Sequence, residues 1–123
     1  MARILVLEDN PLNRDLMQQM LEDAHEVSLA VDGADGVKKA QELLPDLILT
    51  DLSMPGVDGF EAHKRLRADD RTRNIPVIAV TAHAILGDRE RVLAMGFDGY
   101  VSKPVDEDLL LEAIASALKK AAG

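Results

Sequence analysis

Short apolar runs alternate with longer segments of helical period five times along this chain of 123 residues. The runs cover residues 4–7, 26–30, 47–50 and 77–81, with a weaker one at 99–102. That alternation is the sequence signature of βαβ units. The run at 4–7 is continuously apolar, and those at 47–50 and 77–81 are apolar up to a final threonine, as expected for strands of a parallel sheet that are buried on both faces. The alternation therefore predicts an α/β protein.

The segments between the runs predict helices. The first begins at Pro11 after the N-cap Asn10, and its apolar side chains follow the 3.6-residue period: Leu12, Leu16, Met17, Met20 and Leu21. Further helices are predicted over residues 34–44, 59–67, 86–94 and 106–120. Right-handed crossovers turn five such units into a doubly wound, flavodoxin-like sheet of order 2-1-3-4-5 with helices on both faces. We expect a three-layer sandwich.

Length and charge narrow the class of protein further. A chain of 123 residues is sufficient for one domain, which we assign to residues 1–123. The formal net charge of −8 disfavours direct binding to nucleic acid or anionic lipid. The chain has no cysteine, no signal peptide and no apolar stretch near the roughly 20 residues that span a bilayer. These features predict a cytoplasmic protein without membrane insertion.

Polar side chains follow the predicted strands at the points where the strands end. Glu8 and Asp9 follow the first strand, Asp51 follows the third, Thr81 ends the fourth and Lys103 follows the fifth. The carboxyl ends of parallel strands meet at one edge of the sheet, where this class of fold binds ligands. Three carboxylates that meet there repel one another unless a cation neutralises them. All-oxygen ligation of this kind predicts Mg²⁺.

The same edge predicts chemistry on a phosphoryl group. A magnesium ion, a lysine and a threonine around one further carboxylate suit phosphoryl transfer, which is catalysed by positioning and charge neutralisation. Asp51 is the central carboxylate and therefore the predicted nucleophile. A nucleotide or flavin phosphate would require a glycine-rich loop after the first strand. The residues there are Glu8, Asp9, Asn10 and Pro11, which are not glycine-rich and carry two acidic groups.

Four sequence motifs together resemble the receiver domain of two-component response regulators, over essentially the whole chain. They are Leu-Glu-Asp-Asn at 7–10, Pro-Asp-Leu-Ile-Leu-Thr-Asp-Leu-Ser-Met-Pro-Gly-Val-Asp-Gly at 45–59, Val-Thr-Ala at 80–82 and Gly-Tyr-Val-Ser-Lys-Pro at 99–104. The resemblance implies a phosphoprotein in which Asp51 is the phosphoacceptor. Asp9, Asp51 and the backbone carbonyl of Ser53 would bind Mg²⁺, and Glu8 would act through water.

The resemblance also implies how the site is used. Thr81 and Lys103 would bind the phosphoryl oxygens, and the peptide bond between Lys103 and Pro104 would be cis. Thr81 and Tyr100 would form the conformational switch, although simple partial packing is the other interpretation of Tyr100. Ser53 and His83 occupy the two variable positions that tune the lifetime of the phosphoryl group.

Receivers take their phosphoryl group from a phosphohistidine, so the expected partner is a histidine kinase or a histidine phosphotransfer protein in a phosphorelay. The first predicted helix would face that partner, and output would pass to a downstream protein target from the face of the fourth and fifth helices. We expect a monomer or weak dimer. The resemblance implies that the chain catalyses only its own phosphorylation and dephosphorylation, and a receiver of a hybrid histidine kinase would have the same sequence features.

Two other function classes fit part of the pattern. A magnesium-dependent phosphohydrolase with an aspartyl nucleophile would carry a second carboxylate two residues later, but position 53 is serine. A receiver-like interaction module that has lost phosphorylation would lack one of the acidic, threonine or lysine residues, and all of them are present here.

The remaining polar and sulfur-containing residues predict no further site. His25 and His63 lack metal-ligand spacing and are interpreted as surface residues, while Met17, Met20 and Met95 are interpreted as core residues. Acidic residues intersperse the basic side chains between positions 64 and 73. That stretch is therefore interpreted as a solvated helix face, with a nucleic-acid patch as the alternative.

Overall fold

A computed structural model describes residues 1–82 and 88–122 of the chain. Five parallel strands form one sheet of order β2-β1-β3-β4-β5, which confirms the predicted order. The strands are β1 (Arg3–Leu7), β2 (Glu26–Ala30), β3 (Leu47–Asp51), β4 (Val77–Thr81) and β5 (Gly99–Ser102). The strand β3 lies between β1 and β4, so its carboxyl end is at the centre of the ligand-binding edge.

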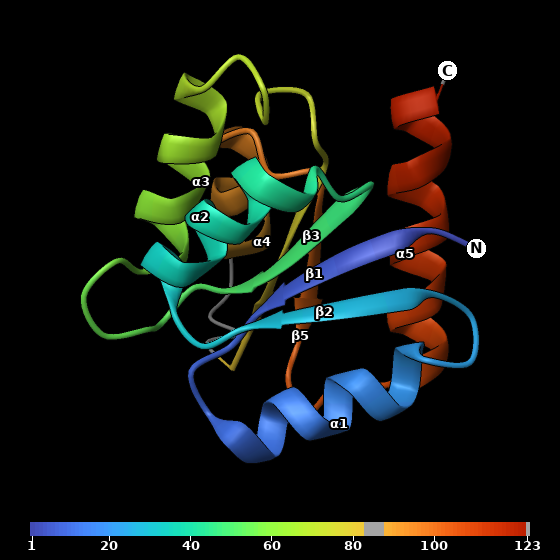
Figure 1. Ribbon diagram of the computed structural model, residues 1–123. Helices are drawn as coiled ribbons and strands as arrows, with labels where there is room; N and C mark the ends of the chain where they lie inside the picture. The colour runs from blue at the N-terminus through green and yellow to red at the C-terminus, as the bar shows by residue number, and fades with distance from the viewer. Residues whose placement is uncertain (83–87, 123) are drawn as a thin grey trace.

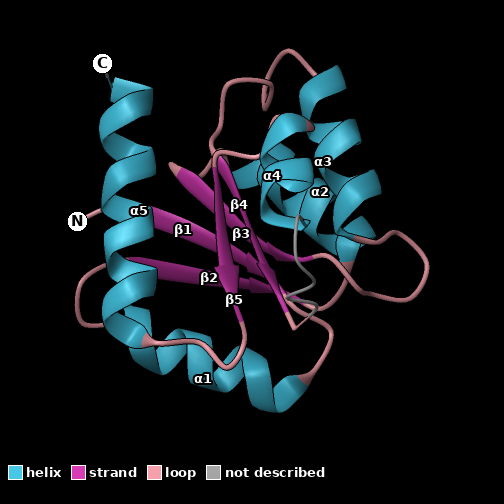
Figure 2. Ribbon diagram, turned by 180° about the vertical axis from the view of Figure 1, so that it is seen from behind, coloured by secondary structure: helices cyan, strands magenta, loops and turns pink. Residues whose placement is uncertain are grey.

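Helices cover both faces of the sheet, as Figures 1 and 2 show. They are α1 (Pro11–Leu21), α2 (Gly33–Leu43), α3 (Gly59–Ala68), α4 (Asp88–Ala94) and α5 (Glu107–Ala122). The helices α1 and α5 lie on one face, and α2, α3 and α4 lie on the other. The predicted three-layer α/β sandwich is therefore confirmed.

Side chains alternate along the strands and so build two separate cores. On β1, Ile4 and Val6 point toward α1 and α5, where they pack with Leu21 and Ile114. Leu5 and Leu7 point to the other face, where the second core also includes the following residues: Val37, Ala40, Ala62, Leu66 and Phe97. Because the central strands are buried on both faces, most of their side chains are apolar, and the charged groups lie at the strand ends.

Each of the first three helices begins with a side-chain cap. Asn10 Oδ1 accepts hydrogen bonds from the backbone N–H groups of Leu12 and Asn13, at 2.9 and 3.2 Å. Asp32 and Asp58 cap α2 and α3 in the same way. These caps satisfy amide groups that a helix start leaves unpaired, and they fix where the chain turns after each strand. The predicted cap at Asn10 and the start at Pro11 are confirmed.

The apolar residues of α1 are only partly covered by the sheet. Leu12 and Leu16, which follow the apolar period of the helix, are 67 and 44 % exposed. The buried stripe of α1 consists of Met17 and Leu21, with Met20 partly buried. Only the side chains on the stripe that faces the sheet are buried, and the two leucines lie outside that stripe.

His63 and Met95 also differ from the sequence interpretation. His63 is buried in α3 and stacks on Phe97, with ring centroids 4.1 Å apart. It lies on the same buried stripe of α3 as Gly59, Ala62 and Leu66, so the helical spacing of these residues indicated that His63 is buried. Met95 is 50 % exposed and follows α4, where Gly96 adopts a φ of 103° and turns the chain. His25 is partly buried, and its Nδ1 accepts a hydrogen bond from the amide of Ala2.

Candidate functional site

Three carboxylates meet at the carboxyl edge of the sheet. Glu8 and Asp9 directly follow β1, and Asp51 is the last residue of the neighbouring strand β3. One carboxylate oxygen from each residue lies within 4.8 Å of the others. Glu8 is only 3 % exposed and Asp51 9 %. The sheet register thus concentrates negative charge where water is scarce.

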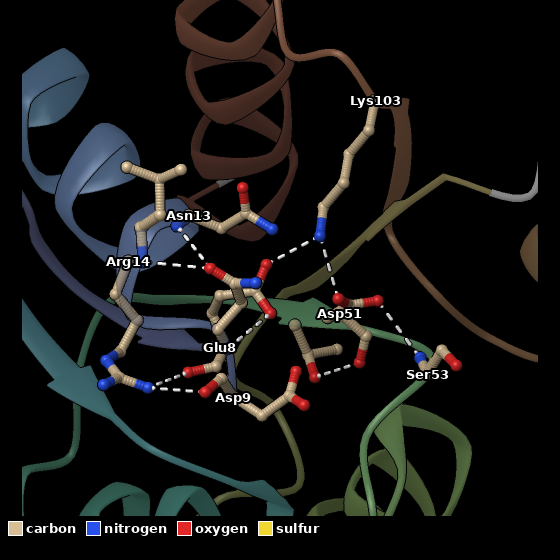
Figure 3. A network of polar contacts seen from close by, with 10 residues as sticks. Glu8, Asp9, Asn13, Arg14, Asp51, Ser53 and Lys103 are labelled. Atoms are coloured by element: carbon tan, nitrogen blue, oxygen red, sulfur yellow. Dashed lines mark hydrogen bonds and ion pairs between the residues drawn. The ribbon is translucent and has the colours of Figure 1, made fainter.

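Lys103 partly neutralises this charge. Its Nζ lies 2.6 Å from Glu8 Oε1 and 2.8 Å from Asp51 Oδ2 (Figure 3). The backbone amide of Lys103 donates to the carbonyl of Thr81 at 2.8 Å, which ties the start of this loop to the end of β4. The peptide bond to Pro104 is cis, as the sequence resemblance implies. One cation therefore bridges two of the three carboxylates.

Burial and charge shift the proton affinities of this group. Burial raises the pKa of Glu8, and the neighbouring charge of Asp51 adds to that effect, although the hydrogen bond from Lys103 opposes it. Burial alone would lower the pKa of Lys103, but its hydrogen bonds to Asp51 and Glu8 outweigh that effect and raise the pKa overall. Lys103 is therefore held in its charged form at neutral pH.

The loop after β3 orients Asp51 from the other side. The backbone amide of Ser53 donates to Asp51 Oδ1 at 3.1 Å, and the amide of Gly59 donates to the carbonyl of Leu52 at 3.2 Å. Gly59 lies so close to the strand end that an added Cβ would be 2.3 Å from the carbonyl oxygen of Asp51. The absence of a side chain at Gly59 allows α3 to begin against the loop that holds the carboxylate.

Thr81 and Tyr100 lie near the loop that follows Asp51. Together with Ser53 they line a cavity of about 390 Å³, whose other lining residues include Met54, Phe60 and Val92. Thr81 is 1 % exposed, and Tyr100 is half-buried. Burial raises the pKa of Tyr100, and the charge of Asp88 acts in the same direction. A hydroxyl and an aromatic ring therefore share a cavity beside the acidic cluster.

The donor atoms at this edge fit a hard divalent cation. The carboxylates of Glu8, Asp9 and Asp51 supply oxygen atoms within 4.8 Å of one another, and Ser53 adds a backbone carbonyl in the adjoining loop. Magnesium prefers such oxygen donors and keeps several water ligands. The residues present are therefore compatible with the magnesium site that the sequence predicts.

Most of the predicted site residues are brought together. Lys103 contacts Glu8 and Asp51, Ser53 contacts Asp51, and Thr81 and Tyr100 share the adjoining cavity. His83 lies outside the described residues. One contact was not predicted from the sequence: Nη1 of Arg14 donates to the backbone carbonyls of Glu8 and Asp9 at 2.8 and 3.0 Å. The available signal was a basic residue in the first turn of a helix that follows an acidic loop.

The fold and this site agree with known proteins. A family model for the response regulator receiver domain matches residues 4–115. The chain belongs to the response regulator receiver domain family. It is 41 % identical over 116 residues to the polar-differentiation response regulator DivK of Brucella anthropi, with 94 % of each chain covered.

Two further relatives show the range of receiver domains. The receiver is 41 % identical to the DNA-binding dual master transcriptional regulator RpaA of Synechocystis, covering 98 % of this chain and 50 % of that protein. The receiver domain of a sensor histidine kinase from Pseudomonas aeruginosa superimposes with a TM-score of 0.87 at 35 % identity, covering 96 and 98 % of the two chains. That structure is described with a magnesium ion coordinated in its active-site cleft.

Family membership gives the coarse function. This is a receiver domain of the two-component response regulator class, whose general role is that of a phosphorylation-dependent switch and whose members interact with histidine kinases. Among the described helices, none combines the length and hydrophobicity that crossing a bilayer requires.

Proposed function

We propose that this receiver domain, which we assign to residues 1–123, accepts a phosphoryl group on the carboxylate of Asp51 from a phosphohistidine. The observation that carries the proposal is the placement of Lys103 Nζ, 2.8 Å from Asp51 Oδ2, beside the carboxylates of Glu8 and Asp9. Phosphoryl transfer depends on positioning and charge neutralisation, which this arrangement supplies.

In the proposed step, an oxygen of Asp51 attacks the phosphorus atom. An O–P bond forms, the N–P bond to the donor imidazole breaks, and the leaving nitrogen keeps the electron pair. The Ser53 amide and Lys103 hold the Asp51 carboxylate from two directions before the reaction. Lys103 then binds phosphoryl oxygens as negative charge increases at Asp51.

Asp9, Asp51 and the backbone carbonyl of Ser53 would hold Mg²⁺, with Glu8 acting through water. When bound, the ion supplies positive charge that offsets repulsion between the carboxylates and the incoming phosphoryl oxygens. The Pseudomonas receiver described with magnesium in its cleft supports this assignment.

Thr81 and Tyr100 are the proposed switch. Phosphorylation adds roughly −1.5 to −2 charge and strong acceptor oxygens at Asp51. Thr81 would hydrogen-bond the phosphoryl group, and the Tyr100 ring would then turn further into the cavity that the two residues share. Burial of Tyr100 would change the surface formed by α4, β5 and α5 when Asp51 is phosphorylated. We place the binding site of a downstream protein target on that surface.

The surface of α1 is the proposed docking face for a histidine kinase or phosphotransfer protein. Leu12 and Leu16 are exposed there, and Leu16 borders an apolar hollow together with Met20, Pro104 and Val105. This hollow also includes Lys103, so a partner docked over it would bring its phosphohistidine close to Asp51. Exposed apolar patches next to a polar site commonly mark such interfaces.

The basic stretch between residues 64 and 73, at the end of α3 and in the turn after it, is a poor nucleic-acid surface. Four of its arginines form ion pairs with carboxylates: Arg65 with Glu61, Arg67 with Asp98, Arg71 with Asp69 and Arg73 with Asp70. We therefore propose output through protein contacts, from a monomer or weak dimer acting in the cytoplasm. The chain would catalyse only its own phosphorylation and dephosphorylation, at a rate tuned by Ser53 and His83.

Intact-mass spectrometry after incubation with acetyl phosphate tests the proposal. We expect the mass of one phosphoryl group to be added, in a reaction that requires both Mg²⁺ and Asp51. Asp51→Asn should stay unmodified, whereas Asp108→Asn, at an exposed position of α5, should react like the unmodified sequence.

The outcomes separate the phosphoacceptor from a phosphorylation-independent interaction module. If the wild type gains no mass at saturating donor and Mg²⁺, the interaction module is the better description. If mass is gained equally by Asp51→Asn, another residue is the acceptor and the proposed chemistry is wrong.

A further inference from the structure

Arg14 holds three consecutive peptide groups of the loop between β1 and α1. Its Nη1 donates to the carbonyls of Glu8 and Asp9, at 2.8 and 3.0 Å, and its backbone amide donates to the carbonyl of Asn10 at 3.0 Å. The side chain is half-buried and folds back from the first turn of α1 (Figure 3). The Arg14 side chain therefore holds two successive carbonyls of the acidic loop.

The three carboxylates of the site are held in different ways. Asp51 receives hydrogen bonds from Ser53 and Lys103, and Glu8 receives one from Lys103. Across residues 1–82 and 88–122, no hydrogen bond to the Asp9 carboxylate is found. The position of that carboxylate therefore depends on its backbone and its own side-chain torsions, and Arg14 contacts that backbone.

The geometry of the loop separates its two polar sides. The carbonyl of Asp9 points to Arg14, while its carboxylate lies on the side of Asp51 (Figure 3). Arg14 forms none of the ion pairs found in the described part of the chain, so it leaves the carboxylate oxygens available. An arginine on carbonyls can position a metal ligand without competing for it.

We propose that Arg14 is a positioning residue for the divalent-cation site, acting through the Glu8 and Asp9 backbone to orient the Asp9 carboxylate. This inference rests on the proposed function, because it assumes that Asp9 binds Mg²⁺. The opposing effect is electrostatic: a positive charge near the site disfavours a cation, and its removal alone would strengthen Mg²⁺ binding. The direction of the change therefore distinguishes positioning from charge.

The test is isothermal titration of Mg²⁺ into the metal-free protein and its variants. Arg14→Met removes the donors and the charge but keeps an extended side chain, and Arg14→Lys keeps the charge and a point donor. Lys120→Met, in the last turn of α5, is the charge-matched control remote from the site. Outer partners of metal ligands typically contribute about 10-fold to 100-fold in affinity. We expect Arg14→Met to weaken Mg²⁺ binding by about 10-fold, Arg14→Lys by less, and Lys120→Met to match the wild type.

Phosphorylation kinetics provide a second measurement. In Arg14→Met the Mg²⁺ concentration for half-maximal reaction with acetyl phosphate should increase by a similar factor, while the rate at saturating Mg²⁺ stays near that of the wild type. A structural defect alone would instead lower the rate at saturating Mg²⁺ in both Arg14→Met and Arg14→Lys, and lysine at position 14 would not restore it.

Four results would contradict the inference or the premise on which it rests. Equal Mg²⁺ affinity in the wild type and Arg14→Met would show that the clamp does not orient Asp9, and tighter binding by Arg14→Met would show that charge dominates. A wild type that binds no Mg²⁺ would instead remove the proposed function on which the inference depends. If Arg14→Met does not fold, Arg14→Lys with unchanged affinity and unchanged half-maximal Mg²⁺ would still contradict it.

Discussion

Lys103 Nζ lies 2.8 Å from Oδ2 of Asp51, a residue 52 positions earlier in the chain. The same ammonium group also contacts Glu8, so one side chain from the end of β5 closes a site built from β1 and β3. The proposed phosphoryl transfer and the local stability therefore involve the same contact.

Replacing Lys103 with methionine should lower stability and make the protein more responsive to Mg²⁺. Two largely buried carboxylates lose their charged partner, which costs about 1–3 kcal/mol in metal-free buffer. A divalent cation would replace part of that charge, so Mg²⁺ should restore more stability to Lys103→Met than to the wild type. Urea unfolding with EDTA and with Mg²⁺ measures both effects. Lys64→Met, at an exposed position of α3, should change stability by less than about 0.5 kcal/mol, and equal stability of Lys103→Met and wild type would contradict the prediction.

His63 should make the fold less stable in mildly acidic solution. Burial lowers its pKa below the ordinary 6.5, and the nearby charge of Arg67 acts in the same direction, while Gly96 and Asp98 oppose it. The unfolded chain then takes up a proton before the folded chain does, so stability is full above about pH 6.5 and declines below it.

Urea unfolding at several pH values between 5 and 8 checks the contribution of His63. In His63→Phe the decline below about pH 6.5 should be shallower, because the aromatic contact with Phe97 remains and no proton is taken up. Burial also lowers the pKa of His25, so His25→Gln measures how much of the decline comes from that histidine. An unchanged slope in His63→Phe would show that His63 is not the source.

Arg67 and Arg65 should differ in their contribution to stability although both lie on α3. Arg67 donates to the carbonyl of Ile75 at 2.7 Å and to Asp98 at 2.9 Å, which ties α3 to the neighbourhood of β4. Arg65 pairs with Glu61 at 3.8 Å on the exposed surface. Arg67→Met should cost about 1–3 kcal/mol and Arg65→Met less than about 1 kcal/mol in thermal or urea unfolding. Similar values for the two variants would refute this ranking.

Gly59→Ala should disturb the Asp51 site as well as the fold. The added Cβ would be 2.3 Å from the carbonyl oxygen of Asp51 and 2.7 Å from the Cα of Leu52, so either the loop or α3 must move. We expect a loss of about 1–3 kcal/mol together with weaker Mg²⁺ binding and slower phosphorylation.

Gly56→Ala is the matched control for this prediction. Gly56 has a φ of 73° with open space around it, so alanine costs roughly 1–2 kcal/mol through its backbone alone. If both variants change Mg²⁺ affinity equally, the close approach at Gly59 is not what positions the site.

The elements themselves could be predicted because their signals are local. The runs at 26–30, 77–81 and 99–102 coincide with the observed strands, and Asn10 caps the first helix as expected. The last helix begins at Glu107 rather than at 106 and extends to Ala122, because helix ends depend on which terminal hydrogen bonds form. The orientation of Leu16 and Met95 was not predictable in the same way, since it depends on which stripe each neighbouring element covers.

The residues that form the site could be predicted from the sequence, but the contacts between them could not. The sequence places Glu8, Asp9, Asp51, Thr81 and Lys103 at strand ends, and parallel strands bring such ends to one edge whatever the details of packing. The bridge from Lys103 to both Glu8 and Asp51, and the clamp of Arg14 on the acidic loop, depend on side-chain torsions and on the exact turn of each loop.

By itself, the sequence determined the α/β class, the strand order and the set of groups at the active edge. Periodicity, crossover handedness and strand-end chemistry are properties of short segments and of chain topology. Only the tertiary structure decided that Lys103 spans two carboxylates, that Arg14 fixes the loop carrying Asp9, and that His63 is buried against Phe97. Those contacts join residues distant in sequence or side chains with several allowed rotamers, and packing selects among the alternatives.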